Sequence, residues 1–394
     1  MVFTTEGLNS MIRYCKLCLL PDTKPDLFFN PEGICAACTA YAARKEVDWK
    51  TREESFIKLV REINVKHRSP WDCIVPVSGG KDSTAQVLKM LELNLNPLCV
   101  NSTTCDLSEI GRFNLQNIKN LGVDLVEFSP DPVVRRKLNR IGLEQVGDIS
   151  WPEHVGIFTI PVRAAVQFKV PLIIWGENSQ NEYGGPASDA LSNTLTRKWL
   201  EEYGGLLGLR VSDLHEAFGI PQNKLIPYFY PTDEELQEVG VTGLFLGHYF
   251  PWDGLSNYLI AQANGFKSFG KTIEGSMVDY ENLDNHQTGI HDYFKYLKFG
   301  FGRATDIAST NIRRGRITRE QGLGIVKELD GRYPSSCLGK KLSEILDPIG
   351  LTENEFGVIC DRFTNTTLFS KDHNGDILRK PDQTPIKINY TNVE

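Results

Sequence analysis

The run Ser78–Thr84 (Ser-Gly-Gly-Lys-Asp-Ser-Thr) contains the residue types that bind a multiply charged oxyanion. It follows the apolar stretch 73–77 and precedes a helical pattern that begins near residue 82. Glycines at such a turn let backbone N–H groups approach an anion closely. The helix N-terminus behind them adds oriented donors and a positive dipole end. The sequence therefore predicts a phosphate-binding loop; the simpler alternative is a structural turn.

This loop is not a Walker A motif, because Asp82 stands where Walker A requires Ser or Thr after Gly-Lys. The pattern Ser-Gly-Gly-x-Asp-Ser resembles the pyrophosphate loop of the PP-loop ATPases. That resemblance implies cleavage of ATP between its α and β phosphates and transfer of AMP to a substrate oxygen. The residues expected to hold the pyrophosphate are Ser78, Gly79, Gly80, Asp82, Ser83 and Thr84.

Two neighbouring assignments within this loop stay open. Asp82 acts through Mg²⁺ or caps the following helix. Lys81 contacts phosphate or is a solvated lysine at the helix start.

Four cysteines near the start of the chain have the spacing of a structural metal site. They form C-x2-C-x16-C-x2-C, within the range of zinc sites, and are Cys15, Cys18, Cys35 and Cys38. Four thiolates close a tetrahedral shell around Zn²⁺ and leave no position for substrate. Metal binding also supplies folding energy that so short a segment lacks. An iron–sulfur cluster and four ordinary cysteines are the alternatives.

Strand and helix patterns alternate from residue 71 onward. Alternation of this kind predicts an α/β fold with a parallel sheet and helices on both faces. Ligands in such sheets bind beyond the carboxyl ends of the strands, so Ser78 and the segment 176–178 are expected on one edge. The expected strands are 73–77, 97–100, 124–128 and 172–175, and the expected helices are 82–93, 107–121 and 155–169.

Composition divides the chain further and limits its partners. We expect a zinc-ribbon segment over 1–45, a linker helix over 46–70, a PP-loop ATPase domain over 71–255 and a mostly helical region over 256–394. The net charge of −7 and the pI near 5.6 argue against broad nucleic-acid binding. The sequence lacks a signal-peptide pattern and an apolar run of about 20 residues that could cross a membrane. We therefore expect a cytoplasmic protein without a membrane partner.

Four features together resemble one family. They are the first cysteine pair with its flanks (13–23), the loop Ser78–Thr84, the segment 175–178 and the block 291–303. This combination is similar to the N-acetyl sugar amidotransferases of the WbpG/PseA-like group, which act in bacterial surface-glycan synthesis. The resemblance runs over nearly the whole chain. Many families share the pyrophosphate loop, whereas the combination of the four features is much more specific.

The resemblance implies conversion of an acetamido group of an N-acetyl sugar into an acetamidino group, using ATP, Mg²⁺ and ammonia. The sugar would be nucleotide-linked or a nonulosonic acid, and the product would enter lipopolysaccharide O-antigen or flagellin glycans. A separate glutaminase, resembling the HisH and HisF pair, is the expected ammonia source. Val2 leaves no N-terminal Cys nucleophile, and the nearest Gly-x-Cys-x-Gly candidate, around Cys337, lacks its first glycine.

Further site residues follow from the same matched blocks. Glu177 and Asn178 would bind Mg²⁺ or position ammonia, with Glu182 as a weaker second carboxylate; a helix cap is the alternative for Glu177. In the fourth block, helical spacing would put three basic side chains on one face. That face could bind a sugar-nucleotide phosphate, or the helix could simply be packed by its aromatic residues. The basic candidates are His291, Lys295, Lys298 and Arg303.

The main rival is a PP-loop enzyme that thiolates tRNA, because some of these also carry an N-terminal zinc ribbon. Such an enzyme needs a basic RNA-binding surface and usually a working cysteine. The acidic balance argues against it, although Cys105 follows the second strand. A non-enzymatic scaffold is disfavoured because the loop is intact. His154 and His248 are interpreted as structural histidines.

Overall fold

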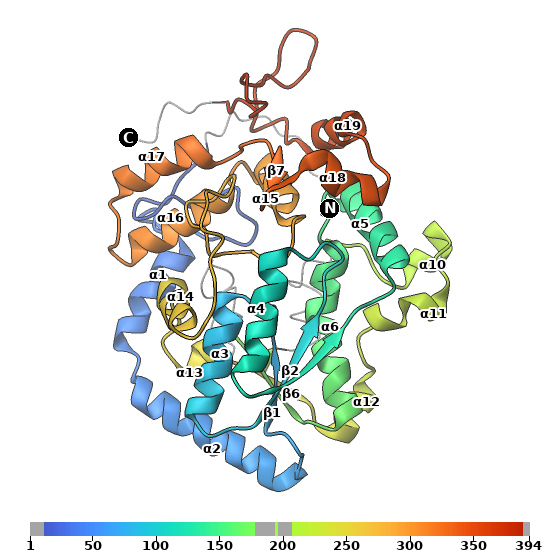
Figure 1. Ribbon diagram of the computed structural model, residues 1–394. Coiled ribbons are helices and arrows are strands. Elements are labelled where there is room, and N and C mark those ends of the chain that lie inside the picture. Colours follow the sequence, from blue (N-terminus) through green and yellow to red (C-terminus); the bar gives the residue numbers. More distant parts are fainter. Residues whose placement is uncertain (1–11, 178–193, 196–206, 389–394) are drawn as a thin grey trace.

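The computed structural model describes residues 12–177, 194–195 and 207–388. A six-stranded sheet lies at its centre (Figure 1). Five of these strands run parallel, and the sixth, β5, pairs antiparallel with β6. The strand order is β3 (Asp124–Phe128), β2 (Pro97–Ser102), β1 (Cys73–Pro76), β4 (Leu172–Trp175), β6 (Thr242–Phe245) and β5 (Thr194–Leu195). The predicted α/β class with a parallel sheet is confirmed.

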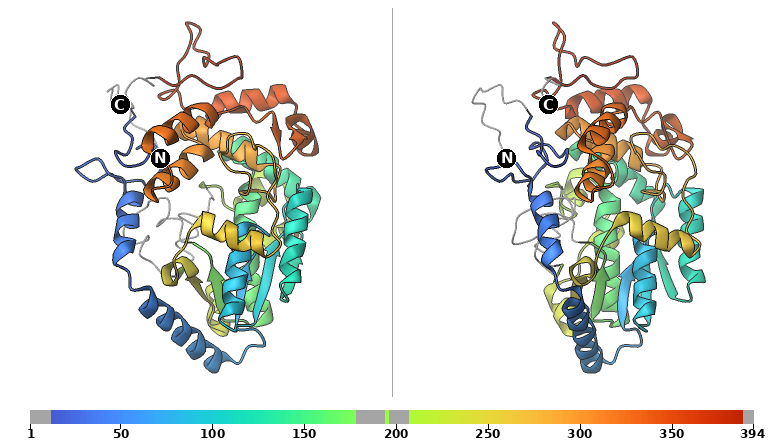
Figure 2. Two further views of the ribbon diagram at one scale, coloured as in Figure 1. Left: turned by 60° about the vertical axis from the view of Figure 1, so that its left-hand side comes forward. Right: turned by 90° about the vertical axis from the view of Figure 1, so that its left-hand side faces the viewer.

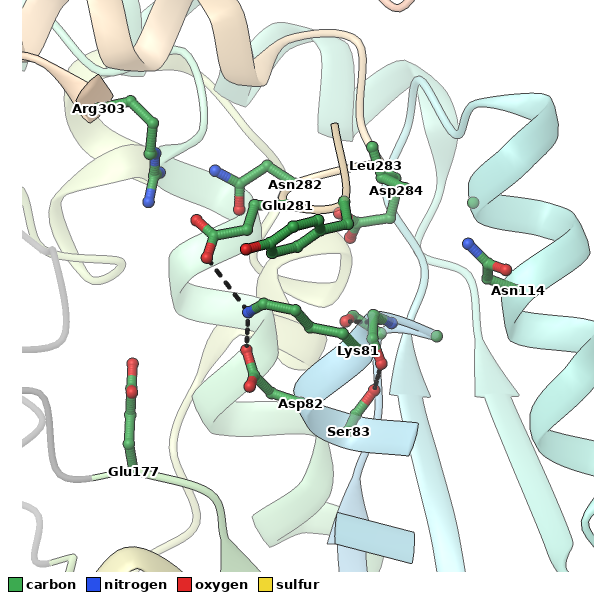
Figure 3. Close-up of a pocket in the computed structure, with 15 residues that line it drawn as sticks. Lys81, Asp82, Ser83, Asn114, Glu177, Glu281, Asn282, Leu283, Asp284 and Arg303 are labelled. Carbon is green, nitrogen blue, oxygen red and sulfur yellow. Dashed lines mark hydrogen bonds and ion pairs between the residues drawn. The ribbon is translucent and has the colours of Figure 1, made fainter. Parts of the chain in front are cut away.

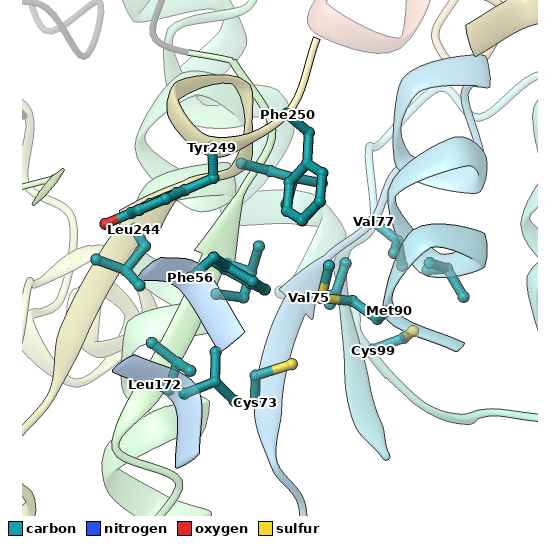
Figure 4. Close-up of a cluster of buried hydrophobic side chains, with 14 of the residues drawn as sticks. Phe56, Cys73, Val75, Val77, Met90, Cys99, Leu172, Leu244, Tyr249 and Phe250 are labelled. Carbon is teal, nitrogen blue, oxygen red and sulfur yellow. The ribbon is translucent and has the colours of Figure 1, made fainter. Parts of the chain in front are cut away.

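The sheet is covered on both faces, as apolar parallel strands require. On one face Val75 and Cys99 pack against Phe56, Met90 and neighbouring side chains (Figure 4). The opposite face packs against α6. The covering helices are α2 (Trp49–His67), α3 (Lys81–Glu92), α4 (Glu109–Asn120) and α6 (Trp151–Phe168).

The strand order creates a crevice at one edge of the sheet. After β1 the chain adds β2 and β3 on one side, and β4 then pairs with β1 on the other side. Open α/β sheets bind ligands at such a switch point, beyond the carboxyl ends of the strands. The loop at 78–80 follows β1, and Gly176 and Glu177 follow β4. The topology therefore puts both predicted segments at the same crevice.

The elements of this part that were not predicted include strands β5 and β6 and helix α5. Strand β6 has four residues and includes Gly243, so its strand signal is weak, yet it pairs with β4 along its whole length. Helix α5 (Pro132–Val146) begins after Asp131, whose carboxylate accepts hydrogen bonds from the N–H groups of Val133 and Val134. Helix α6 begins at Trp151, one turn before the predicted start.

The C-terminal part is mostly helical between 289 and 365, within the region 256–394 for which mostly helical structure was predicted (Figure 2). Helices α15, α18 and α19 share a second apolar core with the end of α5 and the turn that precedes α6. The helices of this part are α14 (Gly254–Ala263), α15 (Thr288–Phe299), α16 (Arg303–Arg313), α17 (Arg319–Leu329), the short α18 (Leu342–Leu346) and α19 (Glu353–Phe363).

Short elements complete the described part. In these ranges no helix is long and apolar enough to span a membrane. The short elements are α1 (Ala36–Ala43), η1 (Arg44–Glu46), α10 (Asp213–Phe218), α11 (Gln222–Leu225), η2 (Ile226–Tyr228), α12 (Asp233–Val239), α13 (Leu246–Tyr249), β7 (Ser336–Cys337), β8 (Lys340–Lys341) and η3 (Asp347–Ile349).

A contact between Arg52 and His248 ties α2 to α13 and makes the fold sensitive to acid. Burial and the Arg52 guanidinium lower the pKa of His248 to about 4. The unfolded chain, with a histidine pKa near 6.5, takes up this proton first as the pH falls. Folded-state stability is therefore lost between about pH 6.5 and pH 4, on the order of 1 kcal/mol after solvent screening.

We expect His248→Gln, which keeps an acceptor without the titration, to flatten this part of the stability profile. Urea unfolding at pH 7, 5.5 and 4.5 measures it. The same change at the exposed His373 is the control and should leave the profile unchanged. Identical profiles for wild type and His248→Gln would contradict the assignment.

Candidate functional site

A cavity of about 210 Å³ lies at the crevice between the ends of β1 and β4 (Figure 3). A smaller adjoining cavity of about 50 Å³ shares six of its lining residues and extends toward α14 and α16. The larger cavity is lined by Ser78, Gly79, Gly80, Lys81, Asp82, Ser83, Gly111, Asn114, Glu177, Tyr280, Glu281, Asn282, Leu283, Asp284 and Arg303.

The phosphate-binding loop owes its shape to Gly79. This residue has a φ of +83°, which disfavours any side chain. A Cβ atom there would lie 2.6 Å from the backbone nitrogen of Leu115, so the loop packs directly on the α4 backbone. Ser78 accepts a hydrogen bond from the N–H of Gly80 at 3.1 Å. The loop is thus set with its residues along the cavity wall.

The hydroxyl groups at the start of α3 stabilise this turn. Ser83 and Thr84 both donate to the carbonyl oxygen of Gly80, at 3.1 and 2.9 Å. Ser83 also lines the cavity, whereas Thr84 is fully buried and lies outside the lining. Gly80 is the N-cap residue of α3, so Asp82 does not cap this helix.

Lys81 is a buried cation held among carboxylates. Its Nζ lies 2.5 Å from Oδ2 of Asp82 and 3.3 Å from Oε1 of Glu281 (Figure 3). Burial disfavours its charge, but Asp82, Glu281 and Glu177 outweigh that effect and hold the pKa of Lys81 above its usual value. The other Asp82 oxygen accepts from Asn257 of α14 at 2.8 Å. Lys81 is therefore not a solvated helix-start lysine.

Glu177 follows β4 and reaches the same cavity from the opposite strand end. Its carboxylate accepts a hydrogen bond from Nε1 of Trp252 at 3.0 Å. Gly176 leaves room for that ring, since a Cβ there would lie 2.9 Å from the indole. Asn178 and Glu182 lie outside the described residues.

Residues 280–284 form a cover over the cavity that sequence reasoning missed. The segment is held beside the start of α4, where the N–H of the N-cap residue Ser108 donates to the carbonyl of Asp284 at 3.1 Å. Upstream, the amide of Asn114 both donates to and accepts from the Lys267 backbone at 2.9 Å. Tyr280, Glu281 and Asp284 thereby enter the lining, and burial raises the pKa of Asp284.

The four clustered cysteines fit a single tetrahedral metal ion. All four are buried, and their sulfur atoms lie within 4.8 Å of one another. The Cys15–Cys38 and Cys18–Cys35 sulfur separations are 3.8 and 3.7 Å. Four Zn–S bonds of about 2.3 Å in a tetrahedron require S···S separations of about 3.8 Å. These separations suit one ion better than a cluster, and the site is compatible with structural zinc.

Comparison with known proteins supports the family that the sequence indicates. Residues 264–381 match the family model "LPS biosynthesis protein WbpG-like, C-terminal domain". This chain carries a WbpG-like C-terminal domain. No curated protein sequence matches the chain. Among solved structures, NMN synthetase from Francisella tularensis is similar at 14% identity and a TM-score of 0.28, over 55% of this chain and 94% of that chain.

The WbpG-like domain supplies the cover of the cavity and one of its cations. Tyr280–Asp284 all belong to the matched range, as does Arg303 at the start of α16. Nε and Nη2 of Arg303 donate to the two oxygens of Asp292 at 3.1 and 3.0 Å. Burial alone would raise the pKa of Asp292, but Arg303 outweighs it and lowers that pKa.

The other basic candidates of this domain lie on α15, outside the lining of both cavities. Lys295 pairs with Asp306, which borders the smaller cavity. Lys298 donates to the carbonyls of Val146 and Gly147 at 3.3 and 3.1 Å. His291 contacts Asp148. A phosphate-binding role for this face stays a prediction.

Proposed function

We propose that the chain is an ATP-dependent N-acetyl sugar amidotransferase that converts an acetamido group into an acetamidino group. One observation carries the proposal. The Ser-Gly-Gly-x-Asp-Ser loop and the WbpG-like domain line the same cavity, so a nucleotide loop and a sugar-pathway domain share one site. The residue divisions 1–45, 46–70, 71–255 and 256–394 and a cytoplasmic location belong to the same proposal.

The reaction explains why ATP is needed. An amide carbon is a poor electrophile, because its nitrogen donates electrons into the carbonyl. Transfer of AMP forms a bond from the amide oxygen to the α phosphorus and breaks the bond from that phosphorus to pyrophosphate. Ammonia then adds at the carbon, AMP leaves with the oxygen, and loss of a proton gives the amidine.

The cavity offers groups suited to each part of this reaction. The N–H groups and hydroxyls of Ser78–Ser83 would hold pyrophosphate by preorganised hydrogen bonds. Lys81 would exchange its contact with Glu281 for phosphate oxygens. Glu177, on the opposite strand end, would orient ammonia. The sugar would lie under the cover, where Tyr280 and Arg303 line both cavities.

The charge of the cavity supports use of ATP with a divalent cation. Four carboxylates line it against two cations, Lys81 and Arg303. A polyphosphate would be repelled by this surplus unless a bound cation offsets it. Asp82 and Glu177 are the residues that would hold Mg²⁺, which would neutralise developing charge. Ammonia would come from solution or from a separate glutaminase partner.

Incubation with ATP, Mg²⁺, ammonium and UDP- or CMP-linked N-acetyl sugars tests this function. We expect AMP and pyrophosphate in equal amounts, both dependent on the sugar and on ammonium. Mass spectrometry should show replacement of one oxygen atom by an NH group in the sugar. Formation of ADP and orthophosphate would refute the proposal, and AMP release that depends on tRNA would favour thiolation.

A further inference from the structure

A cluster of one carboxylate and two imidazoles lies where the sheet part of the chain meets the WbpG-like domain. Asp148 lies in the turn between α5 and α6, His154 in the first turn of α6 and His291 in the first turn of α15. None of the three lines either cavity described above. The cluster is therefore separate from the proposed ATP site.

The three side chains converge on one point. Nδ1 of His291 lies 2.8 Å from Oδ1 of Asp148, and Nδ1 of His154 lies 2.9 Å from Oδ2. One ligand atom from each residue lies within 4.8 Å of the others. The imidazole rings cross at 75° with their centroids 5.0 Å apart. Metal bonds of about 2.0–2.2 Å in a tetrahedron put neighbouring N and O ligand atoms about 3.3–3.6 Å apart, so the side chains would separate by about 0.5 Å to admit an ion.

Hydrogen bonding explains only part of this arrangement. His291 hydrogen-bonds to Oδ1 of Asp148, which also accepts from the N–H of Ser150 at 2.9 Å. Nδ1 of His154 lies close enough to Oδ2 of Asp148 for an ion pair, but it is buried and the geometry is not that of a hydrogen bond within the described residues. A metal ion between the three side chains would satisfy this nitrogen.

We propose that Asp148, His154 and His291 bind a divalent transition-metal ion. Two imidazoles and one carboxylate are a ligand set that suits Zn²⁺ and Fe²⁺. The Asp148 side chain is 2% exposed, whereas those of His154 and His291 are 25% and 29% exposed. The ion would thus be anchored on a buried charge and reached from the imidazole side. Three protein ligands leave coordination positions open, unlike the closed cysteine site.

The site would join two parts of the molecule. Asp148 and His154 belong to the elements that cover the sheet, and His291 belongs to the WbpG-like domain. Lys298, the cation of α15 beside this turn, gives its ammonium to the carbonyls of Val146 and Gly147. The bound ion would therefore balance the buried Asp148 charge and fasten α15 to the turn.

Zinc content of the full chain tests the site independently of its enzymatic activity. The purified protein is equilibrated with excess ZnCl2, desalted and measured by elemental mass spectrometry. We expect two equivalents in the wild type and one in His154→Phe, which keeps a ring but removes the nitrogens. His286→Asn, which changes a nearby histidine held by the Asp106 backbone, should keep two.

The zinc content of a second variant and of the wild type decides between the proposal and its failure. His291→Asn should also hold one equivalent, with zinc affinity at the vacated site reduced by more than about 100-fold, since outer-shell losses alone cost about 10–100-fold. Circular dichroism checks that each variant is folded. One equivalent in the wild type with none in Cys35→Ser would overturn the proposal, as would two equivalents in both histidine variants.

Discussion

A Gly79→Ala variant is expected to lose AMP formation by about 100-fold or more, because misplacing a binding loop by about 1 Å can cost that much. Residue 79 has a φ of +83°. The new Cβ would lie 2.6 Å from the nitrogen and 2.8 Å from the Cα of Leu115. Both are backbone atoms of α4 and cannot rotate away. The loop must therefore move out of the position in which it lines the cavity.

Gly122→Ala is the matched control for this variant. Gly122 has a φ of +86°, but a Cβ there meets no atom within 4 Å. It therefore carries the backbone strain, about 1–2 kcal/mol, without the collision. We expect Gly122→Ala to keep AMP formation and pyrophosphate affinity, while Gly79→Ala loses both and stays folded by circular dichroism. Unchanged pyrophosphate affinity in Gly79→Ala, measured by calorimetry, would contradict the assignment of the loop.

The frame of the cavity could be predicted because it depends on local patterns. Apolar runs ending at Val77 and Trp175 predict parallel strands, and parallel strands bring their carboxyl ends to one edge. Ser78 and Glu177 follow those ends, so their approach to one cavity follows from the strand pattern alone. The cysteine spacing likewise predicts a metal site, and the sulfur positions fit one.

The cover of the cavity could not be predicted in the same way. Residues 280–284 lie in a segment without helical or strand periodicity, and their place is fixed by tertiary contacts. Ser108 bonds to the backbone of Asp284, and Asn114 bonds to the backbone of Lys267 upstream of the segment; any sequence would offer these backbone atoms. The acidic residues Glu281 and Asp284 are the one feature of this segment that is typical of a binding site. Strand β6 was missed because four residues with a glycine give almost no alternation.

Helix α15 shows what residue spacing does and does not determine. His291, Lys295 and Lys298 have the i, i+4, i+7 spacing of one helix face, and the structure has a helix, α15, over these residues. Spacing predicts that these side chains point to the same side of the helix, but it does not predict which groups they contact. Here the three side chains contact Asp148, Asp306 and backbone carbonyls. Partners from distant elements decide whether such a face binds a ligand or joins parts of the chain.

Cys35→Ser is expected to remove one zinc equivalent and to loosen helices far along the chain. The cysteine segment packs on the WbpG-like domain through Leu19, which shares a core with Ala308 of α16 and Val326 of α17. Its backbone is also bonded there, because Leu19 N–H donates to Ser309 and Arg319 donates to the Cys18 carbonyl, both at 3.2 Å. We expect the melting temperature to fall by roughly 10 °C.

Hydrogen exchange can follow how this loss spreads. Residues 12–43 should lose protection first, then α16 and α17, whereas β1 and β4 should keep theirs because they are buried in a separate core. Arg303 begins α16 and lines the cavity, so sugar-dependent AMP formation should weaken more than pyrophosphate binding. Cys105→Ser, outside the cysteine cluster, is the control and should keep zinc and stability. Full protection of α16 and α17 in Cys35→Ser that lacks the zinc of the cysteine site would mean that these helices do not depend on that metal.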